Sequence, residues 1–298
     1  MNILIMGAGA IGSYFGGMLS KNNNVTFIAR KAHSNKINKE GLKIIGKTNL
    51  TARINSFEKI DEISEQFDLI IISVKSFDTE KAIKDIIKSI DKKTIVMSLQ
   101  NGLGNIEKIS KYVSKKNIFA CITSNGVIFE KPGLVRHTGV GYTKIGSIAN
   151  GNEDFILRIL KNLNHSGIKT DLSKDIKKEI WIKAIINSSI NPLTTFFRCK
   201  NGYLIKNPIL SKLVEKICLE STNIAQSYRI NVEFKDMLER TMSVIKDTKE
   251  NYSSMFQSYK NNKPLEIKSI NGYFLKIAKE KNVDYTLNKL ILNSISPS

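Results

Sequence analysis

The chain is poor in the features that mark several classes of protein. It has three cysteines, Cys121, Cys199 and Cys218, and their spacing fits neither a disulfide framework nor a metal site. We therefore expect no bound metal and a reducing compartment, the cytoplasm. No apolar run approaches the length of a membrane span. The apolar start of the chain lacks the basic segment of a secretory signal, so we expect no leader peptide.

Acidic residues are also scarce relative to basic ones. Lys and Arg number 46 against 27 Asp and Glu, which gives a formal net charge of +19. A basic excess of this size is frequent in nucleic-acid-binding proteins. Here the lysines are scattered over exposed positions of helical patterns, and no basic block alternates with stacking aromatics. We therefore expect a small-molecule partner, with neither nucleic acid nor a membrane, while a homodimer stays open.

The amino-terminal residues carry a glycine motif. Gly7, Gly9 and Gly12 have the spacing GxGxxG and follow the apolar run 3–6. In a Rossmann-type fold this motif ends a buried strand and opens a helix, whose N–H groups and dipole bind a pyrophosphate. The three glycines respectively make the turn, admit the pyrophosphate and let the helix pack on the strand. The predicted cofactor-binding residues of this turn are Gly7, Ala8, Gly9, Ala10, Ile11 and Gly12.

The end of the second predicted strand, 25–29, indicates which dinucleotide binds. An NAD site commonly places a carboxylate there to bind the ribose hydroxyls. This chain has Arg30 and Lys31 instead, and no acidic residue precedes Glu40. Cations at this position attract a 2′-phosphate, so we predict NADPH as the cofactor, with Arg30 as its phosphate ligand. In the alternative interpretation, both side chains are ordinary solvated cations.

Buried strands alternate with helices through the first half of the chain. We predict a doubly wound parallel sheet of the Rossmann type, whose ligands gather beyond the carboxyl ends of its strands. Lys75 and Asn101 each follow such a strand. A turn at 131–133 predicts a hairpin that extends the sheet. The further predicted segments are a hairpin at 41–54, strands at 68–74, 94–98 and 168–170, and helices at 78–90 and 154–164.

From about residue 174 onward the strand signal disappears and amphipathic helices follow one another. The sequence thus predicts an α/β protein with a dinucleotide-binding domain at 1–172 and an all-α substrate and catalytic domain at 173–298. Without a linker between them, the two domains are expected to pack directly and to form a cleft. A Lys in the second domain would then reach the nicotinamide bound by the first.

Three polar residues recur every four positions in the first helix of the second half. Lys183, Asn187 and Asn191 therefore share one face of a helix whose other residues are largely apolar. One cation with neighbouring amide donors suits a buried carboxylate or carbonyl ligand. Pro192 predicts that the helix ends or kinks there. In the alternative interpretation, the three residues form a wet stripe on a surface helix.

These features and others together resemble the ketopantoate reductase (2-dehydropantoate 2-reductase) family over nearly the whole chain. The motifs that carry the resemblance are GAGAIG, the VKS that contains Lys75, Gln100–Gly104, Pro132-Gly133 with His137, Trp181–Thr194, Ser253–Met255, Glu266-Ile267 and Asn271-Gly272. The resemblance implies NADPH-dependent reduction of 2-dehydropantoate to pantoate, a step of pantothenate and coenzyme A biosynthesis.

The resemblance also implies roles for individual residues. Lys183 matches the general acid that protonates the developing alkoxide, and Glu266 matches a glutamate close to that lysine and the cofactor. Lys75 and Asn101 match residues that contact the cofactor from the sheet side. The substrate-binding residues that it implies are Lys183, Asn187, Asn191, Asn201 and Ser254.

The sequence departs from the family pattern near the glutamate. Relatives often carry Thr or Ser before it and Asp two residues after it, whereas this chain has Leu265 and Lys268. Reduction of another small branched 2-oxo acid therefore stays open, as does a dinucleotide-binding protein without catalysis. His33 and His137 are candidates for acid–base groups, but a reaction that uses Lys183 needs no second proton donor.

Overall fold

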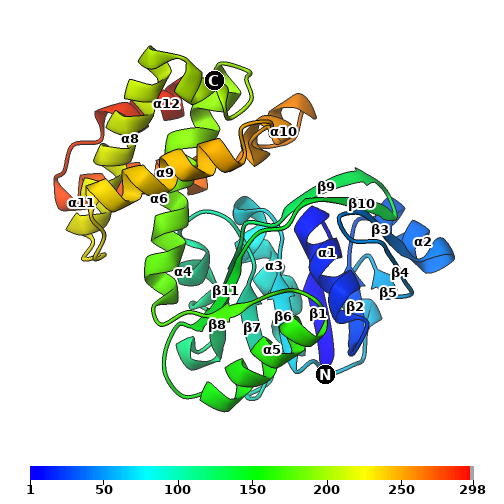
Figure 1. Cartoon of the computed structure of the whole chain (residues 1–298). Helices are drawn as coiled ribbons and strands as arrows, with labels where there is room; N and C mark the ends of the chain where they lie inside the picture. The colour runs from blue at the N-terminus through cyan, green and yellow to red at the C-terminus, as the bar shows by residue number, and fades with distance from the viewer. Residues whose placement is uncertain (296–298) are drawn as a thin grey trace. The chain divides into compact units, whose positions relative to one another are not determined.

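The computed structural model describes residues 1–295, and the chain divides into two compact units (Figure 1). Unit 1 consists of Met1–Gln100 and Asn105–Ile176, and unit 2 consists of Asn101–Gly104 and the chain from Lys177 onward. The loop Asn101–Gly104 thus leaves the sheet of unit 1 and packs within unit 2. The boundary near residue 172 and the role of each domain stay predictions.

An eight-stranded sheet forms the centre of unit 1, in the order β12-β11-β8-β7-β6-β1-β2-β5. The strands are β1 (Asn2–Met6), β2 (Asn24–Ile28), β5 (Asn55–Phe57), β6 (Leu69–Ile72), β7 (Ile95–Ser98), β8 (Ile118–Thr123), β11 (Thr143–Ser147) and β12 (Asp171–Leu172). All neighbours are parallel except β8 and β11. This order, with β1 between β2 and β6, confirms the predicted doubly wound fold.

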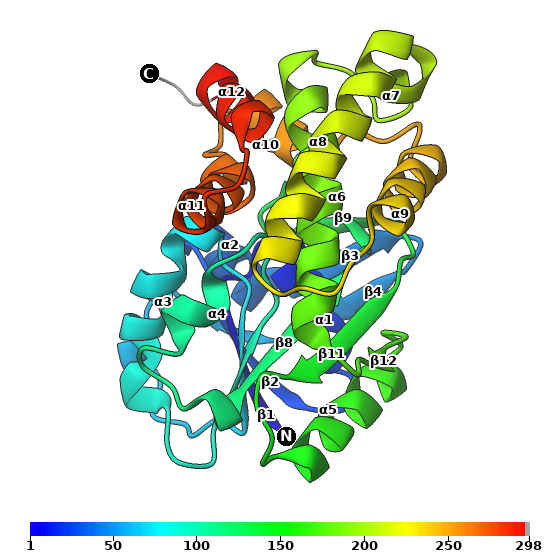
Figure 2. The same cartoon turned by 90° about the vertical axis from the view of Figure 1, so that its left-hand side faces the viewer.

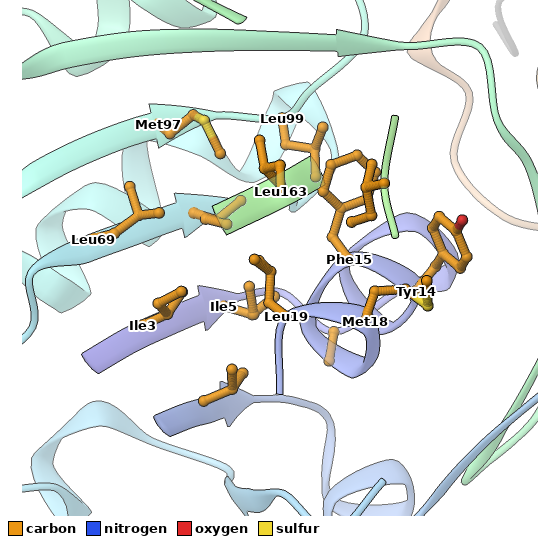
Figure 3. Close-up of a cluster of buried hydrophobic side chains, with 14 of the residues drawn as sticks. Ile3, Ile5, Tyr14, Phe15, Met18, Leu19, Leu69, Met97, Leu99 and Leu163 are labelled. Carbon is orange, nitrogen blue, oxygen red and sulfur yellow. The ribbon is translucent and has the colours of Figure 1, made fainter. Parts of the chain in front are cut away.

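Helices cover both faces of this sheet. They are α1 (Ala10–Leu19), α2 (Lys31–Glu40), α3 (Thr79–Ile86), α4 (Asn105–Ile109) and α5 (Glu153–His165), with short 3₁₀ segments η1 (Ile60–Glu62), η2 (Ser76–Asp78), η3 (Ile87–Ser89) and η4 (Lys115–Asn117). In Figure 3, Leu19 of α1 lies beside Ile5 of β1, and Phe15 of α1 points toward Leu99 and Leu163. Because alternate strand residues face opposite sides, strands covered on both faces are buried along their whole length, as in β6.

The predicted hairpin at 131–133 does not extend the main sheet. Its strands, β9 (Gly126–Lys131) and β10 (Leu134–Gly139), form a second sheet with β3 (Leu42–Gly46) and β4 (Leu50–Ala52), in the order β4-β3-β10-β9. In the main sheet, β11 occupies the position beside β8, the strand that precedes the hairpin. β10 pairs with β3 instead, and the small sheet packs on α1 (Figure 1). The hairpin itself is confirmed, but its place in the fold was predicted wrongly.

The strand predicted at 168–170 lies slightly later in the chain, as β12. The side chain of Asn164 bonds both backbone groups of Thr170, donating to its carbonyl at 2.9 Å and accepting from its N–H at 3.0 Å. These contacts occupy the backbone groups that a strand would use at Thr170. The pairing with β11 therefore begins at Asp171.

Unit 2 is helical throughout its described part, as the sequence predicts. Its elements are α6 (Ile176–Phe196, which begins at the last residue of unit 1), α7 (Tyr203–Lys206), α8 (Pro208–Ser227), α9 (Phe234–Asp247), α10 (Ser254–Lys260), η5 (Glu266–Ser269), α11 (Asn271–Lys281) and α12 (Thr286–Ile295). Figure 2 shows the long helices α6 and α8 among them. Among the described helices, none is both long and apolar enough to cross a bilayer.

The helix that carries the polar stripe continues past Pro192 to Phe196. The helix therefore does not end at Pro192, and a kink at this position stays a prediction. Buried hydroxyls support the helix here: Ser189 donates to the carbonyl of Ile185, and Thr195 donates to that of Asn191 at 2.7 Å. These bonds lie one turn before and at the position of the proline, whose missing N–H would have bonded the carbonyl of Ser188.

Candidate active site

The glycine turn of unit 1 has the geometry of a dinucleotide-binding turn. Gly7 has φ +100°, and a Cβ there would lie 2.5 Å from Cγ1 of Val74. At Gly12, a Cβ would lie 2.4 Å from Oγ of Ser73 and 2.5 Å from the carbonyl oxygen of Gly7. The turn and the close packing of α1 on β1 therefore both require glycine at these positions.

Gly9 differs from the other two glycines because no atom lies within 4 Å of the position its Cβ would take. Glycine is not needed there for packing, whereas a ligand that approaches the backbone would need that space. Gly9 is also the N-cap of α1, and no side chain caps the helix. Its open space and uncapped N–H groups fit a pyrophosphate.

A chain of side-chain hydrogen bonds supports this turn from behind. The N–H of Gly133 donates to Nδ1 of His33 at 2.9 Å, and Nε2 of His33 lies 3.1 Å from Oγ of Ser13. Ser13 in turn donates to the carbonyl of Ala8 at 3.1 Å. Since Nδ1 accepts, Nε2 carries the proton of the neutral ring. This series of hydrogen bonds connects the β9–β10 turn to the glycine turn.

His33 is 4% exposed, and burial lowers its pKa from 6.5 to about 4. His137 is also buried: its Nε2 donates to the carbonyl of Gly139 at 3.0 Å, and its Nδ1 lies 2.9 Å from Oγ1 of Thr48. Burial lowers the pKa of His137 as well. Both rings are thus neutral structural groups within unit 1, with both nitrogens engaged, and neither is placed as a proton donor.

Arg30 lies directly after β2, at the N-cap of α2, and its side chain is exposed. The first turn of α2 contains no acidic residue. Glu40, the first acid of this segment, lies at the far end of α2 and pairs with Lys36. Because β1 and β2 are parallel neighbours, Arg30 and the glycine turn share one edge of the sheet.

Lys75 follows β6 at the same edge of the sheet. It is half-buried at the N-cap of η2, and β6 neighbours β1. The backbone on either side of it is fixed: Gln100 donates to the carbonyl of Val74 at 2.9 Å, and Lys108 donates to that of Ser76 at 2.7 Å. Unit 1 therefore brings the glycine turn, Arg30 and Lys75 to one edge.

In unit 2, the polar stripe lies along the middle of α6. Lys183 and Asn187 are half-buried and Asn191 is 6% exposed. The residues around them are buried in the core of the unit: Trp181, Ile182, Ala184, Ile185, Ile186 and Ile190. α6 is therefore a core helix with one polar face, and the surface-helix interpretation does not describe it.

Two of the other predicted substrate-binding residues lie on segments near the end of α6. Ser254 is exposed at the first position of α10, while its neighbour Ser253 caps that helix and accepts from Thr194 of α6 at 2.7 Å. Asn201 is buried, and its amide donates to Thr248 at 2.8 Å. Its Oδ1 is buried and has no hydrogen-bond partner among the described residues.

Glu266 is 7% exposed at the first position of η5, whereas Lys268 of the same turn is exposed. The loop that contains Asn101 packs on this turn: the N–H of Leu103 donates to the carbonyl of Ser269 at 2.8 Å. At Gly102, with φ +81°, a Cβ would lie 2.8 Å from that carbonyl oxygen. Unit 2 thus joins the Asn101 loop to the turn of Glu266.

Comparisons with known proteins agree with this arrangement. The family described as "Ketopantoate reductase PanE/ApbA" matches residues 3–150, and "Ketopantoate reductase PanE/ApbA C terminal" matches residues 175–297. The chain belongs to the ketopantoate reductase family. Ketopantoate reductases of known sequence include the 2-dehydropantoate 2-reductases of Pyrococcus abyssi and Pyrococcus horikoshii, 36% and 37% identical. Each alignment covers 98% of this chain and 95% of the relative.

Solved structures of similar fold include two that bear on the chemistry. A ternary structure of D-mandelate dehydrogenase with NADH and anilino(oxo)acetate has a TM-score of 0.93 at 30% identity and covers 99% of this chain and 97% of its own. A putative 2-dehydropantoate 2-reductase from Enterococcus faecalis has a TM-score of 0.76 at 30% identity, covering 99% and 96%. The dehydrogenase structure contains NADH, which agrees with a nicotinamide cofactor for this family member.

The supporting residues were not recognised from the sequence. Ser13, His33 and Gln100 fix the backbone of unit 1, and Thr194 and Ser253 join helices of unit 2. Ser253 stands in a motif that carried the family resemblance, but the candidate was its neighbour Ser254. Except for the bond from Ser13 to Ala8, these contacts connect residues 20 or more positions apart, so no local pattern signals them.

Proposed function

We propose that this protein catalyses the NADPH-dependent reduction of 2-dehydropantoate to pantoate in the cytoplasm. The observation that carries the proposal is the full-length agreement with named 2-dehydropantoate 2-reductases, together with a polar stripe on an otherwise buried helix. Unit 1 is the proposed cofactor-binding half and unit 2 the proposed substrate and catalytic half. The dinucleotide is held by the glycine turn, Arg30, Lys75 and Asn101.

The reaction needs a proton and stabilisation of negative charge at one oxygen. When bound, the reduced nicotinamide supplies a hydride to the keto carbon. The ammonium of Lys183 stabilises the charge that develops on the keto oxygen and donates a proton to it from Nζ. Glu266 is the partner that keeps this amine in place and in its charged form.

The remaining polar residues of unit 2 bind the rest of the substrate. Asn187 and Asn191 continue the stripe of Lys183 and offer amide donors to the carboxylate and the hydroxyl group. Asn201 contributes a buried amide near the end of α6, and Ser254 offers an exposed hydroxyl. A substrate that carries both a carboxylate and a hydroxyl group uses all of these groups.

The choice of NADPH rests on Arg30. A guanidinium binds a phosphate through charge-assisted hydrogen bonds worth about 1.5–3 kcal/mol. We expect Arg30→Asp to weaken NADPH binding about 10- to 100-fold, with a much smaller effect on NADH, in a titration of each dinucleotide. Lys31→Asp makes the same charge reversal at the neighbouring exposed cation. It is the matched control, and it should weaken NADPH binding less than Arg30→Asp does. Equal weakening of both dinucleotides by Arg30→Asp would contradict its role as the phosphate ligand.

A second candidate is favoured by the structural similarity to D-mandelate dehydrogenase. In that case the protein reduces another 2-oxo acid and prefers NADH. A steady-state assay of NADPH and NADH absorbance with 2-dehydropantoate and with an aromatic 2-oxo acid separates the two. The proposal predicts the highest kcat/KM for 2-dehydropantoate with NADPH. A higher value for the aromatic acid supports the second candidate, and binding without turnover of either acid contradicts both.

A further inference from the structure

Pro192 leaves a backbone acceptor of α6 without its usual donor. In an α-helix the N–H of each residue bonds the carbonyl four positions earlier, and proline has no N–H. The carbonyl that loses its donor is that of Ser188, next to Asn187 of the polar stripe. Ser188 is buried, so water does not readily replace the missing bond.

Asn271 supplies a replacement from a different part of the chain. Its Nδ2 donates to the carbonyl of Ser188 at 3.3 Å, across 83 residues of sequence. The same Nδ2 donates to Oδ1 of Asn288 at 2.9 Å. Asn271 is 0% exposed, and its own Oδ1 has no partner among the described residues. Nδ2 of Asn271 is thus engaged while its Oδ1 is left unsatisfied. We infer that the bonds donated by Nδ2 determine the orientation of this side chain.

Asn288, the second partner of Asn271, is itself held by hydrogen bonds. Asn288 donates through its side chain and its backbone to Oε1 of Glu220, both at 2.7 Å. Glu220 is buried in α8 and also accepts from the N–H of Leu287 at 2.8 Å, so it caps the start of α12. Ser221 of α8 lies 2.9 Å from the hydroxyl of Ser188. Asn271 therefore bonds α6 and α12 directly, and both of its partners are bonded in turn to α8.

The location of Asn271 connects this network to the proposed active site. It is the first residue of α11 and follows η5, the turn that begins with Glu266. Its partner Ser188 lies on α6, the helix that carries Lys183 and Asn187. We propose that Asn271 is a positioning residue: its amide replaces the N–H that Pro192 lacks and so fixes the Glu266 turn against the polar stripe of α6. The catalytic part of this inference rests on the proposed function.

The inference makes a specific test possible, because the missing donor can be restored. Pro192→Ala returns an N–H that can bond the carbonyl of Ser188 within the helix. We expect Asn271→Ala to lower kcat about 10-fold or more, since small displacements of reacting groups are costly, with Kd for NADPH changed less than twofold. In the Asn271→Ala/Pro192→Ala double variant, we expect recovery of at least part of kcat and of the melting temperature.

Asn288→Ala is the matched control. It removes a buried amide from the same network but leaves the contact from Asn271 to Ser188, so Pro192→Ala is not expected to rescue it. The inference is supported if Pro192→Ala restores kcat in the Asn271→Ala background but not in the Asn288→Ala background. Equal rescue of both variants, or of neither, overturns it. If wild type turns over no 2-oxo acid, the proposed function fails, and the melting temperatures of the same four-variant cycle still decide whether the two residues are coupled.

Discussion

The two units build their candidate sites from different materials. In unit 1 the site is mainly backbone: a turn in which Gly7 and Gly12 lie against neighbouring atoms, while Gly9 faces open space. In unit 2 the site is made of side chains, with Lys183, Asn187 and Asn191 on one face of α6. A backbone site is disrupted by adding atoms to it. A side-chain site is disrupted by removing atoms from it.

The supporting contacts differ in the same way. In unit 1 the neutral ring of His33 connects the β9–β10 turn to the glycine turn, so one titratable group supports a backbone conformation. In unit 2 the direct contacts to α6 come from amides and hydroxyls, such as Asn271 and Thr194, whose charge does not change with pH, while the carboxylate of Glu220 lies one contact further away, behind Asn288. We therefore expect protonation of His33 to weaken the support of unit 1.

The largest expected effect comes from removing atoms in unit 2. Lys183→Ala is expected to lower kcat by about 10²- to 10⁴-fold, the usual contribution of a positioned acid, because the developing alkoxide loses both charge stabilisation and its proton. Steady-state kinetics with 2-dehydropantoate measure the loss, and titration should show NADPH binding largely retained. Lys177→Ala, at an exposed position of the same helix, is the control with wild-type kinetics. A Lys183→Ala enzyme as fast as wild type would remove this residue from the mechanism.

Replacing a glycine of the unit 1 turn with alanine should affect ligand binding at Gly9 and folding stability at Gly12. Gly9→Ala fills open space, so we expect a melting temperature close to wild type but NADPH binding weakened about 10-fold or more. Gly12→Ala collides with Ser73 and the carbonyl of Gly7, so we expect loss of stability itself. Calorimetry and NADPH titration of both variants measure the difference. Wild-type NADPH affinity in Gly9→Ala would show that no ligand uses that space.

Acid should weaken unit 1 through His33. Its pKa in the folded protein, about 4, lies below the ordinary 6.5, so the unfolded chain binds the proton first as the pH falls. The corresponding stability is present above pH 6.5, decreases through the window between the two values and is lost below about pH 4. The full loss is about 3 kcal/mol. Urea unfolding at several pH values should show a smaller pH dependence for His33→Gln, while His165→Gln, at an exposed site, should match wild type.

The smallest expected effect concerns the charge that departs from the family pattern. Lys268 is exposed, although Glu266 of the same turn is buried. Interactions between exposed charges are screened and contribute about 0.2–1 kcal/mol, so Lys268→Asp should change kcat/KM for 2-dehydropantoate by less than about fivefold. The change should diminish further at high salt. A larger change, or a new preference among 2-oxo acids, would assign Lys268 to substrate selection.

Features that depend on residues close together in the sequence were predicted correctly, whereas features that depend on distant residues were not. The glycine turn, the doubly wound sheet and the helical second unit depend on short motifs and hydrophobic periodicity, and the structure confirms them. The hairpin at 131–133 was recognised locally, but its pairing with β3 depends on residues about 90 positions away and was predicted wrongly. Pro192 predicted a helix end or kink, and the helix continues; the contact from Asn271 to the carbonyl of Ser188 was not visible locally.

The candidate site follows the same rule. The stripe of α6 was legible because residues four positions apart share a helix face. Glu266, Asn201 and Ser254 have no local signal and were found only through the family resemblance. The contacts that hold them, such as Asn201 to Thr248, join segments distant in sequence. Periodicity identifies which residues face a site, but only tertiary contacts identify what fixes them there.

The central claim is that the ammonium of Lys183 meets the substrate oxygen beside a nicotinamide held by the glycine turn. The most direct measurement is a crystal structure of the protein with NADPH and a non-reacting 2-oxo acid analogue. The account predicts Nζ of Lys183 within about 3.2 Å of the keto oxygen, with the pyrophosphate against Gly9. A Lys183 side chain directed into solvent, or a dinucleotide bound away from Gly9, would contradict it.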